Sequence, residues 1–113
     1  MNWYPKRRSK YNSTTCTCQA GHMHHSRFEA GYCNDLHRLK RQGEVLEIRT
    51  QVKYSMDVNG IHITNYYADF VVTGKDGAVS VHETKGMVTD VYIIKKRLFS
   101  ACYPGVPFHE IKY

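Results

Sequence analysis

Two short turn sequences constrain the fold of this chain more than any other feature. Asn59-Gly60 and Lys75-Asp76-Gly77 place glycine where a tight reversal of the chain needs a left-handed backbone. The segments beside these turns are rich in β-branched and aromatic residues, and they span residues 45–54, 61–72 and 78–85. Because turns of this length join antiparallel neighbours, the sequence predicts three consecutive antiparallel strands.

Helical patterns flank these strands. Ser26 and Glu29 have the spacing of a capping box, and Gly43 supplies a stop for the helix that they would begin. A second helix is predicted to begin at Thr89 and to end before Pro104. The apolar stripes expected on the two helices are Phe28, Tyr32, Leu36 and Leu39 on the first, and Val91, Ile94, Leu98 and Ala101 on the second.

A last strand is predicted over residues 106–111, which completes the order α-β-β-β-α-β. This order predicts an α+β fold in which helices flank a mixed sheet. A chain of 113 residues has room for one domain, so we expect a basic N-terminal arm at 1–12 and a folded core at 13–113. No stretch is apolar and long enough to cross a membrane, and we expect a cytoplasmic protein.

The positive charge of the chain is concentrated near its beginning. Four of the cations behind the net charge of +6 lie in the first eleven residues, where there is no acidic residue. These cations are Lys6, Arg7, Arg8 and Lys10. A basic arm flanked by aromatic residues is suited to phosphate contacts along a nucleic acid, and the alternative is a solvated tail.

The second turn fixes the register of the strands beside it. If Gly74 pairs with Ala78, then Asp69 lies opposite Glu83, and Lys85 projects from the same face as Glu83. Two carboxylates placed opposite each other destabilise a sheet unless a cation lies between them, and Mg²⁺ binds through one or two carboxylates. A neighbouring lysine can stabilise charge that develops on a phosphate.

Asp69, Glu83 and Lys85 have an alternative interpretation as a cross-strand salt-bridge cluster on a solvent-exposed face. Four residues predicted on the same face argue against it, because they would set these charges into a partly apolar surface. These residues are Tyr67, Val71, Val79 and Val81.

The order of these elements and residues resembles the PD-(D/E)XK nuclease superfamily, and within it a small phage and prophage family close to Holliday junction resolvases. The resemblance covers roughly residues 9–112. It is carried by Ser26-Arg27-Phe28-Glu29-Ala30, Gln51-Val52-Lys53, Tyr67-Ala68-Asp69-Phe70, Glu83-Thr84-Lys85-Gly86, and Lys95 through Tyr103-Pro104-Gly105. Ala68 stands where the name of the motif has proline.

This resemblance implies a restriction-endonuclease-like core and hydrolysis of DNA phosphodiesters with Mg²⁺ or Mn²⁺. It implies that Asp69 and Glu83 bind the metal with help from the backbone carbonyl of Thr84, and that Lys85 is the catalytic lysine. It also implies that Glu29 reaches the same site from the first helix and that Gln51 is an accessory polar residue. The expected substrate is branched or duplex DNA, and the expected assembly is a homodimer that makes paired cuts.

Cysteine and histidine residues form a second cluster in a predicted hairpin at residues 14–24. Because side chains alternate along a strand, Cys16 and Cys18 share a face of this hairpin, as do His22 and His24. Thiolates and imidazoles are the ligands of structural Zn²⁺, although C-x-C-x3-H-x-H is not the spacing of a known zinc module. The alternatives are a zinc site and an unliganded polar hairpin.

Lys95 and Lys96 on the second helix have two interpretations, as phosphate contacts or as part of a solvated helix face. The sequence also permits an interpretation other than nuclease activity. A non-catalytic nucleic-acid-binding module, stabilised by zinc, would use the basic arm and the aromatic residues without a carboxylate pair.

Overall fold

The computed structural model describes residues 16–17, 23–24 and 26–113, and the chain divides into two compact units, residues 1–35 and 36–113. In the first unit, the two-residue strands β1 (Cys16–Thr17) and β2 (Met23–His24) pair antiparallel. The predicted hairpin is confirmed for these four residues. Its register places the backbone of Cys16 opposite that of His24.

Helix α1 (Arg27–Arg41) begins in the first unit and ends in the second. Its start follows the capping box, because the backbone amide of Glu29 donates to Ser26 Oγ at 3.0 Å. Gly43 adopts a φ of 81°, and the amide of Glu44 donates to the carbonyl of Leu39 at 3.0 Å. The left-handed glycine therefore ends the helix where the sequence predicted a stop.

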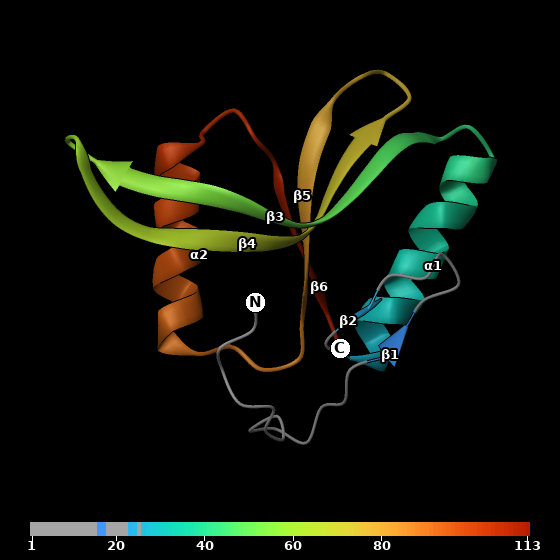
Figure 1. Ribbon diagram of the computed structural model, residues 1–113, viewed down its shortest axis with the longest axis horizontal. Coiled ribbons are helices and arrows are strands. Elements are labelled where there is room, and N and C mark those ends of the chain that lie inside the picture. Colours follow the sequence, from blue (N-terminus) through green and yellow to red (C-terminus); the bar gives the residue numbers. More distant parts are fainter. Residues whose placement is uncertain (1–15, 18–22, 25) are drawn as a thin grey trace. The chain divides into compact units, whose positions relative to one another are not determined.

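The second unit contains a four-stranded sheet with the order β3-β4-β5-β6 (Figure 1). The strands are β3 (Val45–Val58), β4 (Ile61–Gly74), β5 (Val79–Lys85) and β6 (Phe108–Lys112). The first three are antiparallel neighbours, whereas β6 runs parallel to β5. The predicted α+β order with a mixed sheet is confirmed. Among the described residues, no helix combines the length and the apolar character needed to cross a membrane.

Both predicted turns form. Asn59 and Gly60 join β3 to β4 with φ values of 52° and 80°, as a two-residue turn with both residues left-handed requires. Between β4 and β5 the amide of Gly74 donates to the carbonyl of Ala78 at 2.9 Å, and Gly77 has a φ of 85°. The β4–β5 strand pairs, from Thr73 with Val79 to Phe70 with His82, follow the predicted register.

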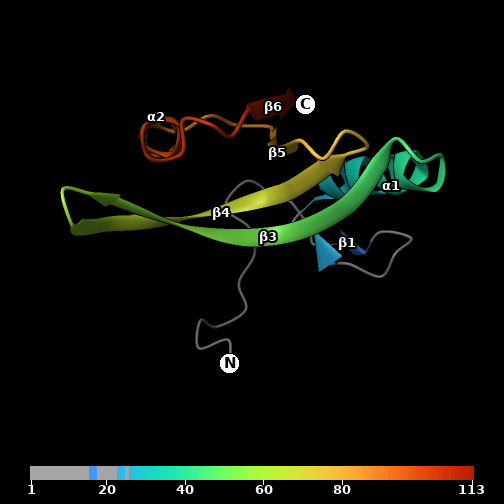
Figure 2. The ribbon, with the colours of Figure 1, turned by 90° about the horizontal axis from the view of Figure 1, so that it is seen from above.

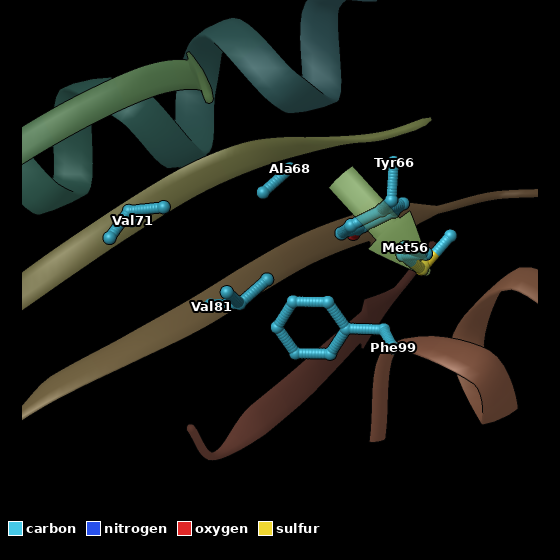
Figure 3. Close-up of a cluster of buried hydrophobic side chains, with 6 residues drawn as sticks. All are labelled: Met56, Tyr66, Ala68, Val71, Val81 and Phe99. Atoms are coloured by element: carbon cyan, nitrogen blue, oxygen red, sulfur yellow. The ribbon is translucent and has the colours of Figure 1, made fainter. Parts of the chain in front are cut away.

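Helix α2 (Asp90–Cys102) packs on one face of this sheet, as Figure 2 shows from above. The core between them consists of Met56, Tyr66, Ala68, Val71, Val81 and Phe99 (Figure 3). The predicted apolar stripe of α2 was wrong for Val91 and Ile94, which are more than 60% exposed, whereas Leu98 packs against this core. The helix instead buries Tyr92 and Phe99, which are seven residues apart and therefore lie on one face.

The alternation of side chains between the two faces of β4 shifts by one residue at Asp69. Strict alternation would put Tyr66 and Ala68 on one face and Val71 on the other, yet all three lie in the same core cluster. Thr50–Phe70 and Val52–Ala68 pair in the same register, whereas Gln51 and Asp69 between them are not paired, and Gln51 has a φ of 52°. The phase change removes Val71 from the face of Tyr67, which is 53% exposed, so the prediction that the two residues share a face was wrong.

Candidate active site

Asp69 is held on the buried side of the sheet by donors from both neighbouring strands. Its Oδ2 accepts the backbone amide of Thr84 at 3.0 Å and the hydroxyl of Thr84 at 2.8 Å. Its Oδ1 accepts Nε2 of Gln51 at 3.3 Å. Because only 8% of Asp69 is exposed, these bonds replace the water that a carboxylate ordinarily binds. They also fix the orientation of the carboxylate.

Glu83 lies beside Asp69, on β5. Its Oε1 accepts the hydroxyl of Tyr66 at 2.5 Å and the backbone amide of Asp69 at 3.3 Å. Each carboxylate therefore accepts a hydrogen bond from a backbone amide of the opposite strand, directly beyond the last β4–β5 pair, Phe70 with His82. Burial raises the pKa of Glu83, and the negative charge of Asp69 raises it further.

Lys85 adds a positive charge to the two carboxylates. Its Nζ lies 4.0 Å from Oε2 of Glu83 and 4.3 Å from the centre of the Tyr92 ring. About a quarter of its side chain is exposed, so the ammonium group is accessible from solvent at the margin of the buried pair. The site thus combines two buried carboxylates with one accessible cation.

Tyr92 and Glu110 extend this site, and sequence reasoning missed both. The hydroxyl of Tyr92 donates to Oε1 of Glu110 at 2.6 Å, and Glu110 forms ion pairs with Lys96 and Lys112 at 3.6 Å. In the parallel β5–β6 register Glu110 is the partner of Glu83. The sequence repeats the E-x-K pattern of 83–85 at 110–112, but the pattern alone does not predict that the two segments pair.

Residues 8–113 match a family model described as "Protein of unknown function (DUF1064)". The chain belongs to the DUF1064 family. The match to DUF1064 includes all of the site residues of β3, β4 and β5. No curated protein and no solved structure matches the chain.

In this DUF1064 protein the structure brings four of the predicted site residues together, Gln51, Asp69, Glu83 and Lys85. Thr84 joins them through its amide and hydroxyl, whereas the proposed role of its carbonyl stays a prediction. Glu29 lies in the first turn of α1, in the unit formed by residues 1–35, and its part in the site also stays a prediction.

The remaining predicted binding residues of the DUF1064 protein are less fully described. Lys6, Arg7, Arg8, Lys10, Cys18 and His22 lie outside the described residues. Cys16 and His24 are described through their backbone pairing. Within residues 26–113 and the two short strands, no group of three or more metal-binding side chains occurs. Lys95 is half-buried, and Lys96 is engaged by Glu110 and lies over the ring of Phe108.

Proposed function

We propose that this chain is a metal-dependent DNA endonuclease of the PD-(D/E)XK superfamily, with a restriction-endonuclease-like fold. The observation that carries the proposal is the placement of Asp69 and Glu83 side by side on adjacent strands, with Lys85 at their margin. Both carboxylates are less than 10% exposed. Burying two like charges side by side costs free energy, and a role in solubility would not explain that cost.

The donor set fits a divalent cation. Oδ2 of Asp69 and Oε1 of Glu83 each accept two hydrogen bonds, which hold the two carboxylates in place. Among the described residues, Oδ1 of Asp69 contacts Nε2 of Gln51 at 3.3 Å and Oε2 of Glu83 contacts Nζ of Lys85 at 4.0 Å, so each of these oxygens has one contact. Carboxylate oxygens are the ligands that Mg²⁺ and Mn²⁺ prefer, and these two oxygens would hold the ion.

When bound, such an ion polarises a phosphate oxygen and makes a bound water more acidic. The side chains of the protein supply the rest of the apparatus. Lys85 stabilises the negative charge that develops on the phosphate during hydrolysis, and it orients the attacking water. Tyr66, Thr84 and Gln51 keep the carboxylates in one geometry before substrate arrives, which reduces the reorganisation that the reaction requires.

Branched DNA is the substrate class that we propose. A chain of 113 residues has few side chains to spare for base edges, so it would recognise the shape of the DNA through phosphate contacts. One such site cuts one strand. A homodimer would bring two sites to the two strands that a junction resolvase must cut.

The test is cleavage by the purified chain of a four-way junction, a linear duplex and a single strand of matched sequence, with Mg²⁺ or Mn²⁺ titrated. We expect metal-dependent paired nicks beside the branch point. Asp69→Asn and Glu83→Gln should each lower the cleavage rate by about 10³-fold or more, because about 4 kcal/mol of transition-state stabilisation depends on the ion.

Asp57→Asn is the matched control, because Asp57 is an exposed carboxylate near the C-terminal end of β3. Its cleavage rate should equal that of the wild type. Undiminished cutting by the Asp69 and Glu83 variants would refute the site. A wild-type chain that binds all three DNAs and cuts none of them would instead favour a non-catalytic binding module.

A further inference from the structure

The side chain of Lys85 is restrained by an aromatic ring. Its Nζ lies 4.3 Å from the centre of the Tyr92 ring, well inside the range of a cation–π interaction. A lysine ammonium is a strongly hydrated charge on a flexible four-carbon chain, so without restraint it samples many positions. The contact with Glu83, at 4.0 Å, is too long to restrain it alone.

Tyr92 is itself anchored by two hydrogen bonds. Its backbone amide donates to the N-cap hydroxyl of Thr89 at 3.1 Å, so the first turn of α2 fixes its main chain. Its hydroxyl donates to Glu110 at 2.6 Å, and only 6% of the residue is exposed. The ring is therefore a rigid surface, because both ends of the residue are bonded to different elements of the fold.

A ring face attracts an ammonium group without accepting a directed hydrogen bond. The N–H groups of Lys85 consequently remain available to a water or a phosphate oxygen, which would not be so if a second carboxylate held the ammonium group. Glu110 is such a carboxylate, and its hydrogen bond to Tyr92 and its ion pairs with Lys96 and Lys112 occupy it.

We propose that Tyr92 is a positioning residue that holds the ammonium group of Lys85 ready for the scissile phosphate. This inference rests on the proposed nuclease function. It assigns to α2 a role in the reaction, whereas the sequence predicted for that helix a packing face, with Lys95 and Lys96 either as phosphate contacts or as part of a solvated face.

Three variants test the proposal. Tyr92→Leu removes the ring, Tyr92→Phe keeps the ring and removes the hydroxyl, and Tyr103→Phe removes a hydroxyl that donates to the carbonyl of Ser55 at 2.6 Å elsewhere. The measurements are kcat and KM on the best-cut DNA, thermal unfolding, and the NMR shifts of the Lys85 side-chain protons without metal. The ring current of Tyr92 should move these proton resonances upfield in the wild type.

We expect Tyr92→Leu to lower kcat about tenfold to thirtyfold with KM nearly unchanged, and to abolish the upfield shift. Tyr92→Phe should keep the shift and kcat within about threefold of the wild type, because the ring remains. Tyr103→Phe should match the wild type in both measurements.

The inference is overturned if the wild type cuts DNA and folded Tyr92→Leu cuts it equally fast. It is also overturned if Tyr92→Phe loses as much activity as Tyr92→Leu, since the hydroxyl network rather than the ring would then matter. A wild type that cuts no DNA refutes the proposed function, and the inference with it, even where the upfield shift is present.

Discussion

Gln51 and Asn59 have the same backbone φ of 52°. Gln51 lies within β3, and Asn59 directly follows the last residue of that strand. Asn59 has a local reason for this conformation, because it precedes Gly60 in a two-residue turn that needs two left-handed residues. Gln51 has no such reason. It lies inside β3, where neighbours on both sides pair with β4 in one unbroken register.

This difference indicates that backbone strain is located at Gln51 rather than at Asn59. At Asn59 the residue type suits the conformation, because asparagine tolerates the left-handed region. At Gln51 the conformation is imposed by the surrounding sheet, and it coincides with the phase change that directs Asp69 toward Thr84 and Glu83. Residues in sparsely populated conformations cluster at functional sites.

The largest expected effect on stability concerns the turn. Gly60→Ala should lower the free energy of unfolding by about 1–2 kcal/mol, because a side chain at a φ of 80° is strained although the space around it is open. Chemical denaturation measures this change. Gly105→Ala is the control, because Gly105 also faces open space but is not left-handed, and it should not destabilise the chain. The DNA cleavage rate should be unaffected in both variants.

A smaller effect, of opposite sign, is expected at the site. Relative to Gln51→Ala, which loses the same amide donor, Gln51→Gly should raise the free energy of unfolding by about 1 kcal/mol by relieving strain. It should also slow DNA cleavage, because Asp69 loses the amide donor at 3.3 Å. Asn59→Gly is the matched variant at the turn, and it should leave the cleavage rate unchanged. If Gln51→Gly is no more stable than Gln51→Ala, the left-handed backbone of Gln51 does not store strain.

The smallest effect concerns the exposed carboxylate near the turn. Hydrogen bonds with His62 and Ser55 lower the pKa of Asp57 below its ordinary value of 3.8. The ionised form therefore stabilises the fold above pH 3.8, and this contribution is lost as the pH falls through the lowered pKa. His62→Ala should raise the pKa of Asp57 in an NMR titration. Gln51→Gly should leave that pKa unchanged, and a shift there would show that the two regions are coupled.

Features with a local cause could be predicted from the sequence. Glycines at the two turns and the capping box at Ser26 determine chain reversals and a helix start, and the second turn alone set the register that brings Asp69 to Glu83. These predictions needed only neighbours within a few residues.

Features decided by tertiary packing could not be predicted in this way. The buried face of α2 is aromatic, at Tyr92 and Phe99, whereas its exposed aliphatic residues gave the more regular helical pattern. Tyr67 faces solvent while Val71 is buried because the alternation breaks at Asp69, and no residue type marks that break. Glu110 became recognisable as a neighbour of the site only once β6 was known to pair with β5 in parallel.

The parallel pairing of β5 and β6 also gives the edge of the sheet a duplicated tripeptide. Glu110 and Lys112 stand in register with Glu83 and Lys85, so two E-x-K segments lie side by side. A search for the short motif alone finds both and cannot choose between them. The choice comes from charge distribution: the β6 glutamate is satisfied by Lys96 and Lys112, while the β5 glutamate shares its surroundings with Asp69.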